Sequence, residues 1–94
     1  MIGRVRPTRW AAMAVDPDGC GALILNLHDG SWTHLNPTAA AYWNEVVTGG
    51  RTHLDALAAL AGRFGVSPER LDTDLTSLLD DLHQRRLITM EEAR

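Results

Sequence analysis

The sequence predicts a small α+β domain in which a three-stranded antiparallel sheet is followed by three helices. Residues 10–35 consist of short apolar or alternating segments separated by turn residues, the pattern of strands. Residues 37–86 instead repeat apolar residues at helical spacing between N-cap and glycine signals. The 94 residues suffice for one domain with one core, which excludes a multidomain enzyme.

The strands are expected to follow one another through tight turns. Trp10–Val15 is the first, and Asp16–Gly19 reverses the chain because its proline presets φ and its glycine allows a positive φ. Ala22–Leu27 is the strongest strand, a short apolar run. An Asp-Gly pair then favours a hairpin that returns the chain as Ser31–Leu35. Residues 1–9 and 89–94 have no clear period, and we expect them to be frayed.

The third strand has the most distinctive pattern. Leu35 adjoins the start of a helix and should face the core, which turns Trp32 and His34 outward. The sequence contains no fourth strand to pair with this one. An exposed aromatic residue on an open edge is either an aggregation hazard or a docking surface, and an extended peptide can pair with such an edge. The alternatives are that Trp32 covers a neighbouring strand or forms a dimer contact.

Three helices complete the chain. The first is expected from Pro37 to about Val47, with Asn36 as N-cap and a glycine pair as its stop. Thr52 caps the second, and Ser67 with Pro68 opens a third that runs to about Arg86. The expected apolar faces are Ala39, Ala40, Trp43, Val46 and Val47, then Leu54, Leu57, Ala58, Leu60, Ala61 and Phe64, then Leu71, Leu75, Leu78, Leu79 and Leu82. This order is compatible with a winged helix-turn-helix-like arrangement.

Composition excludes several classes of protein. Nine basic residues, all arginine, face twelve acidic ones, a balance that argues against a duplex-DNA binder. The single Cys20 cannot form an internal disulfide. No apolar run is long enough for a signal peptide or a spanning helix, so we expect a cytoplasmic protein. The four histidines (His28, His34, His53 and His83) lack metal-ligand spacing and are expected at the surface, and we expect no metal, cofactor or catalytic site.

One flank of the third helix combines different side-chain types. On a helical wheel Asp74 and Asp81 lie on the same side of the leucine stripe, near Leu78 and Arg85. The flank therefore presents apolar, anionic and cationic groups together. A solvated surface is the commoner meaning of such a flank, and a binding surface is the alternative.

Three stretches together resemble the PqqD-like family of leader-peptide recognition proteins, also called RiPP recognition elements. They are GALILNLHDGSWTHLNPTAAAYWNEVVTGG, LAALAGRFGVSPE and DTDLTSLLDDLHQRRLI, within residues 10–90. The Leu-Asn-x-Thr-Ala pattern followed by Tyr-Trp looks most like the stand-alone subunits of lasso-peptide biosynthesis. The branch that serves pyrroloquinoline quinone synthesis usually has a proline and an acidic residue near the end of its second strand. One departure is Arg86, which stands where the family usually has glycine.

The resemblance implies a non-catalytic protein that binds the leader of a ribosomal precursor peptide as an added strand. The leader would lie beside the third strand, in a groove completed by the third helix. The protein would then present the precursor to a separate leader protease, with a cyclase acting afterwards. We expect a monomer, and an edge-strand dimer is the alternative.

The implied leader-binding residues fall on two elements. The strand side comprises Ser31, Trp32, Thr33, His34 and Leu35, and the helix side comprises Asp74, Leu78, Asp81, Leu82 and Arg85. Leu78 and Leu82 would receive apolar leader side chains, with a core position as the alternative for Leu82, and Arg85 would pair with a carboxylate. If the strand binds through its backbone, Thr33→Pro should weaken binding more than Thr33→Ala. The remaining alternatives are a PqqD-type chaperone of quinone-cofactor biosynthesis, a winged-helix DNA-binding or dimerisation module, and an enzyme with an unrecognised site.

Overall fold

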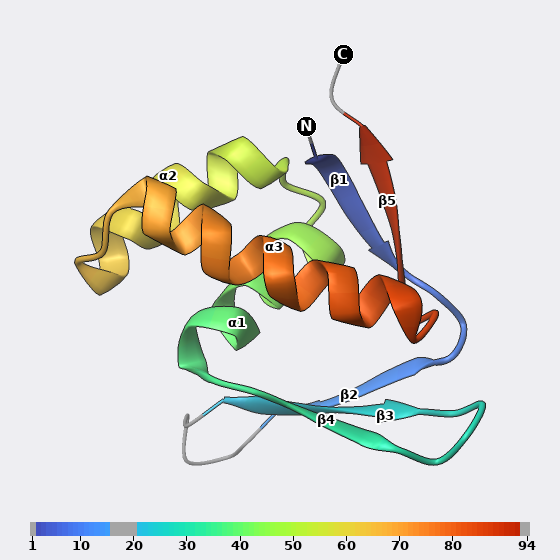
Figure 1. The fold of residues 1–94 in the computed structure, drawn as a ribbon. Helices are drawn as coiled ribbons and strands as arrows, with labels where there is room; N and C mark the ends of the chain where they lie inside the picture. The colour runs from blue at the N-terminus through green and yellow to red at the C-terminus, as the bar shows by residue number, and fades with distance from the viewer. Residues whose placement is uncertain (1, 16–20, 93–94) are drawn as a thin grey trace.

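The computed structural model describes residues 2–15 and 21–92 (Figure 1). The elements in chain order are β1 (Ile2–Pro7), β2 (Ala11–Val15), β3 (Ala22–Asn26), β4 (Trp32–Leu35), α1 (Pro37–Tyr42), the π-helix η1 (Trp43–Thr48), α2 (His53–Phe64), α3 (Pro68–Gln84) and β5 (Ile88–Glu92). Figure 1 shows the helices on one side of the sheet formed by β2, β3 and β4, with the β1–β5 ribbon at one end of the helical layer. The predicted turn at Asp16–Gly19 and Cys20 lie outside the described residues.

The predicted α+β fold, with a three-stranded antiparallel sheet before three helices, is confirmed. The strand order is β2-β3-β4, and Ile24 and Leu35 point from the sheet into the core with 0% and 1% of their surface exposed. Gly21, which precedes β3, has a φ of +128°, and a Cβ at that position would lie 2.1 Å from the Leu35 carbonyl oxygen. Only glycine allows this close approach between the start of β3 and the end of β4.

A second sheet corrects the expectation that both ends of the chain are frayed. β1 and β5 pair as an antiparallel ribbon, and Val5 and Ile88 are each only 1% exposed. Arg6 also forms an ion pair with Glu91 across the ribbon, with 3.3 Å between Nε and Oε1. Residues that pair across this ribbon are more than 80 positions apart in the sequence. Neither segment alone has a pattern that predicts the pairing.

The first predicted helix divides into two parts. The Asn36 side chain accepts a hydrogen bond from the Ala39 N–H and caps α1, as expected. From Trp43 the chain widens into η1, whose N–H groups bond carbonyls further back than in an α-helix. Trp43, Val46 and Val47 of η1 are buried. The expected apolar face is confirmed, and Tyr42 joins it.

The caps of α2 and α3 are confirmed, but the inward face of α2 differs from the prediction. Thr52 and Ser67 accept hydrogen bonds from Asp55 and Arg70 N–H groups, and the left-handed Gly65 ends α2. Leu54 and Ala58 were predicted to be apolar-face residues and are exposed, whereas His53 and Ala56 are buried. The prediction was wrong because it counted apolar residues only, and a buried histidine occupies part of the face.

The end of α3 explains how the chain accommodates Arg86. This residue adopts a φ of +62°, the left-handed conformation that glycine favours at this position. The N–H groups of Arg86 and Leu87 bond the carbonyls of His83 and Leu82, which is the Schellman pattern. The Asn26 side-chain amide, on β3, donates to the Arg85 carbonyl at 3.2 Å. None of the helices in the described part of the chain combines the length and apolar character needed to cross a membrane.

Candidate functional site

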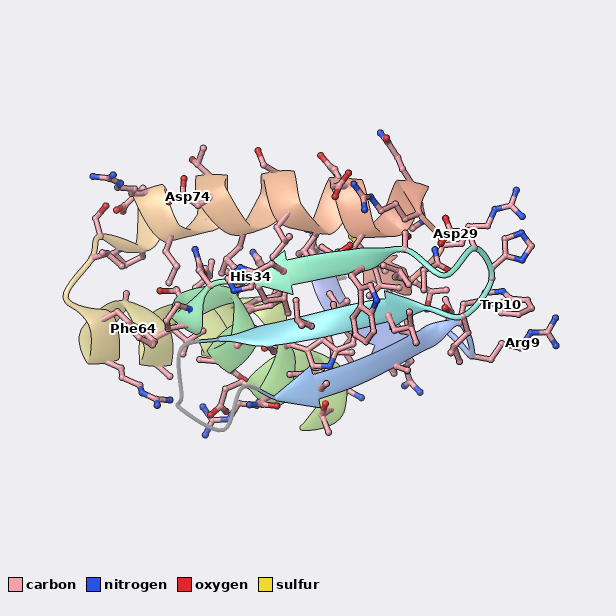
Figure 2. The ribbon with its side chains drawn as sticks, turned by 90° about the horizontal axis from the view of Figure 1, so that it is seen from below. Arg9, Trp10, Asp29, His34, Phe64 and Asp74 are labelled. Carbon is pink, nitrogen blue, oxygen red and sulfur yellow. The ribbon has the colours of Figure 1, made fainter. Side chains whose placement is uncertain are left out.

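A groove lies between β4 and α3. Figure 2 shows α3 running beside β4, with His34 on the strand and Asp74 on the helix at the same end of the molecule. The groove has a volume of about 210 Å³ and is lined by the end of β4, the start of α1, the loop residue Val66 and α3 residues between Arg70 and Leu78. It is therefore built by two of the elements that the sequence indicated, β4 and α3.

The groove has an apolar floor and a polar rim. Leu35, Leu71 and Leu75 form much of the floor and are at most 3% exposed, and Leu78 is half-buried beside them. His34 and Asp74 line the same groove and are exposed to solvent. Such a groove can accept an apolar side chain and leave polar atoms of the same ligand in water.

Arg85 connects the two walls at the C-terminal end of α3. Its Nη1 donates a hydrogen bond to the Thr33 hydroxyl at 3.1 Å, and its Nε lies 3.3 Å from Asp81 Oδ2. The Arg85 and Asp81 side chains keep 44% and 48% of their surface exposed. Exposed ion pairs contribute little to stability, so the guanidinium can exchange these partners for others at small cost.

The register of the hairpin determines which backbone groups face the groove side of β4. The Asn26 N–H bonds the Ser31 carbonyl, and the β3–β4 pairing continues from this contact without a bulge. In an antiparallel ladder alternate residues bond the neighbouring strand. Thr33 and Leu35 therefore bond β3, whereas the N–H and C=O groups of Trp32 and His34 point to the other edge. No strand within residues 2–15 and 21–92 pairs with that edge.

The register of β4 changes the prediction for Thr33→Pro. The Thr33 N–H faces Ile24 on β3, so a proline there would break the hairpin rather than the open edge. The edge-facing N–H groups belong to Trp32 and His34, and substitutions that probe the edge should be made there.

The turn before β4 is held by side chains. Hydrogen bonds from the Ser31 hydroxyl and N–H lower the pKa of Asp29, which keeps this carboxylate charged. The buried Asn26 accepts the His28 N–H through Oδ1 while its amide group reaches the end of α3. One side chain thus fixes both the turn that begins β4 and the helix that forms the opposite wall of the groove.

Comparison with protein families identifies the chain. The model of coenzyme PQQ synthesis protein D (PqqD) matches residues 21–88, which include β3, β4, all the helices and the groove. The chain belongs to the PqqD family. Members of this family are peptide-binding partners of other biosynthetic enzymes. Comparisons with curated proteins and with solved structures gave no significant match.

Within this PqqD-family fold, the ten residues proposed from the sequence occupy distinct places. Trp32 and His34 are exposed on the outer face of the sheet, as expected, and Leu35 faces the core. Leu35, His34, Asp74 and Leu78 line the groove, and Ser31 belongs to the turn. Thr33, Asp81 and Arg85 contact one another beyond the groove, toward the C-terminal end of α3. Leu82 is 1% exposed and lies in the core, so its side chain does not form part of the groove surface.

Sequence reasoning missed several groove residues. Val66, Arg70, Leu71 and Leu75 line the groove but were absent from the proposed set. Arg70, Leu71 and Leu75 lie within one helical turn of Asp74 and Leu78, so helical spacing could have found them. Val66, in the loop before α3, carries no such periodic signal.

The PqqD-family chain also buries a histidine that was expected at the surface. His53 is 2% exposed; its Nδ1 lies 2.7 Å from the Tyr42 hydroxyl and its Nε2 lies 2.7 Å from Asp72 Oδ1. Because a carboxylate only accepts, Nε2 carries a proton, and in the neutral ring Nδ1 accepts from Tyr42. The side chains thereby link α1, α2 and α3. No group of three or more metal-ligating side chains occurs within the described ranges.

Proposed function

We propose that this PqqD-family protein is a non-catalytic module that binds the leader segment of a ribosomally synthesised precursor peptide. The leader adds as a fourth strand to the free edge of β4, beside α3. The observation that carries the proposal is the open edge at Trp32 and His34 next to a groove with an apolar floor. Backbone pairing supplies affinity in this mode, and side-chain pockets supply selectivity.

The binding groups have complementary roles. The N–H and C=O groups of Trp32 and His34 can form up to four hydrogen bonds, each worth about 0.5–1.5 kcal/mol net. Leader side chains that point inward reach the groove, where Leu78 and the floor accept an apolar group. A leader carboxylate toward the C-terminal end of α3 would replace Thr33 or Asp81 as partner of Arg85.

More specifically, we propose that the protein acts in lasso-peptide biosynthesis in the cytoplasm. It would deliver the precursor to a separate leader protease, and a cyclase would act afterwards. The support for this assignment is the Leu35–Ala39 pattern followed by Tyr42-Trp43. The second candidate is a peptide chaperone of quinone-cofactor biosynthesis, which the description of the matching family favours. The two differ in the peptide bound and in the enzyme that receives it.

A DNA-binding role has less support. The helix beside the open edge carries five carboxylates, Glu69, Asp72, Asp74, Asp80 and Asp81, which would repel phosphates. An electrophoretic assay at low salt should show no retardation of duplex DNA.

The test is a titration of the ¹⁵N-labelled protein with synthetic peptides that tile the N-terminal halves of short reading frames beside its gene. We expect one peptide to shift the amides of Trp32 and His34 and groove residues on α3, and its scrambled version to shift none. Shifts confined to β1, β5 or the exposed face of α2 would contradict the proposal. A binder encoded beside a protease and a cyclase supports the lasso assignment, and one encoded beside quinone-cofactor enzymes supports the second candidate.

A further inference from the structure

The outer face of the β2-β3-β4 sheet carries an apolar patch at the open edge. Trp32 is 55% exposed and Leu23 is 40% exposed, and Leu25, the register partner of Trp32, is half-buried. We call these three residues the Trp32 ledge. The helices lie on the opposite side of the sheet, so within the part of the chain that the structure describes no helix covers the ledge (Figure 1).

The ledge is continuous with the edge at which a peptide strand would add. Side chains of directly paired residues lie on the same face of a sheet, with Cβ atoms about 4.5–5.5 Å apart. The peptide residues paired with Trp32 and His34 would therefore project over the outer face. Those paired with Thr33 and Leu35 would project toward Arg85 and the groove on the inner face. A bound strand would thus contact the protein through both of its faces.

We propose that the Trp32 ledge is a second specificity site, which selects an aromatic or large aliphatic side chain on the peptide residue paired with Trp32. This inference rests on the proposed strand addition, and it specifies the class of peptide side chain that the ledge binds. No ledge residue carries a charge, so a charged peptide side chain there would lose hydration without gaining an ionic partner within the ledge. An aromatic or branched side chain would instead cover Trp32 and reach toward Leu23.

The ledge side chains can be substituted without altering the hydrogen-bonding groups at the open edge of β4. Leu27 N–H bonds the Trp10 carbonyl, and the β2–β3 register continues from that pair, so the backbone groups of Leu23 face β2. Leu23→Thr therefore alters the ledge and leaves the hydrogen-bonding groups of β4 intact. Trp32→Thr removes the indole and retains a β-branched residue suited to a strand.

The experiment selects peptides from a phage-displayed library of random dodecapeptides on the full chain. We expect wild-type protein to enrich peptides with an aromatic or large aliphatic residue at one position, which cross-strand nuclear Overhauser effects should pair with Trp32. Trp32→Thr should bind a selected peptide about three- to tenfold more weakly. Leu23→Thr should show a smaller loss, and Leu54→Gln, at an exposed leucine on α2, should show none.

A double-mutant cycle distinguishes the contribution of the ledge side chains to binding from that of backbone pairing at the open edge. Alanine at the peptide position paired with Trp32 should weaken binding to wild type and should have almost no further effect on Trp32→Thr. If peptides shift the Trp32 and His34 amides but show no preference at that position, or if the alanine effect is equal in both proteins, the ledge inference is overturned and strand addition stands. If no peptide shifts those amides, strand addition itself fails. Self-association of wild type that Trp32→Thr abolishes would make a second copy the occupant and would also overturn the inference.

Discussion

Arg86 shows how a single residue can depart from a family pattern without changing the fold. Its left-handed backbone and the two hydrogen bonds of the Schellman pattern end α3 as glycine would. The side chain makes this conformation unfavourable by about 1 kcal/mol. Surrounding contacts offset the cost, because the Arg86 carbonyl accepts a 2.6 Å hydrogen bond from the Thr8 hydroxyl and Leu87 is fully buried.

Arg86→Gly should raise the free energy of unfolding by about 1 kcal/mol, because glycine adopts the left-handed conformation without steric cost. Urea denaturation monitored by tryptophan fluorescence measures the change. Arg86→Ala is the matched control: it removes the guanidinium and keeps the Cβ, so stability should stay within about 0.5 kcal/mol. An equal gain in both variants would show that the guanidinium, and not the backbone, causes the strain.

At the scale of elements, the two edges of β4 have different roles. Ser31, Thr33 and Leu35 face β3 through their backbones, whereas Trp32 and His34 face the free edge. The same alternation places the side chains of Trp32 and His34 on the outer face and those of Thr33 and Leu35 on the inner face. Trp32 and His34 thus offer backbone groups to a ligand, whereas Thr33 and Leu35 use theirs to hold β4 against β3.

His34→Pro should weaken binding of the leader or of a selected peptide about tenfold, because it removes an edge-facing N–H without breaking a β3–β4 hydrogen bond. His34→Ala should bind within about twofold of wild type. Isothermal titration measures both affinities, and circular dichroism checks that each variant is folded. Thr33→Pro, in contrast, should lower stability as well as binding. Equal affinities for His34→Pro and His34→Ala would contradict backbone pairing at this edge.

At the scale of the whole molecule, a chain of polar side chains joins the described helices, running from the buried Tyr42 and His53 to the half-exposed Asp72. His53 connects Tyr42 with Asp72, and Thr76 also donates to that carboxylate at 3.3 Å. Burial, assisted by the negative charge of Asp72, raises the pKa of Tyr42 well above its ordinary value. The folded protein therefore retains the Tyr42 proton at pH values where the unfolded chain releases it.

Stability should consequently fall at high pH. Below about pH 10, where an unfolded tyrosine is neutral, the contribution of Tyr42 is fully present. Above that pH the unfolded chain binds fewer protons, so the free energy of unfolding should drop by about 1.4 kcal/mol per pH unit until the folded pKa is reached. Urea denaturation from pH 8 to 11 measures this slope, and Tyr42→Phe should lack the tyrosine contribution. The chain contains one tyrosine and no lysine, which makes the comparison specific. The same slope in both proteins would contradict the assignment.

The sequence by itself determined the local elements. Turn residues, caps and apolar spacing predicted β3, β4, the caps of all three helices and the outward positions of Trp32 and His34, because each signal lies within a few residues of its effect. The same patterns predicted the order of the elements and indicated the resemblance to the PqqD-like family. The candidate site was predicted in outline, since the strand and the helix flank were both named.

Only the tertiary structure decided the rest, because those features depend on residues far apart in the chain. The β1–β5 ribbon and the buried His53 arise from contacts that local periodicity does not encode. The register placed the free N–H groups on Trp32 and His34 rather than Thr33. Asn26 connects the turn before β4 to the end of α3, and this contact between the elements of the two walls spans 59 residues.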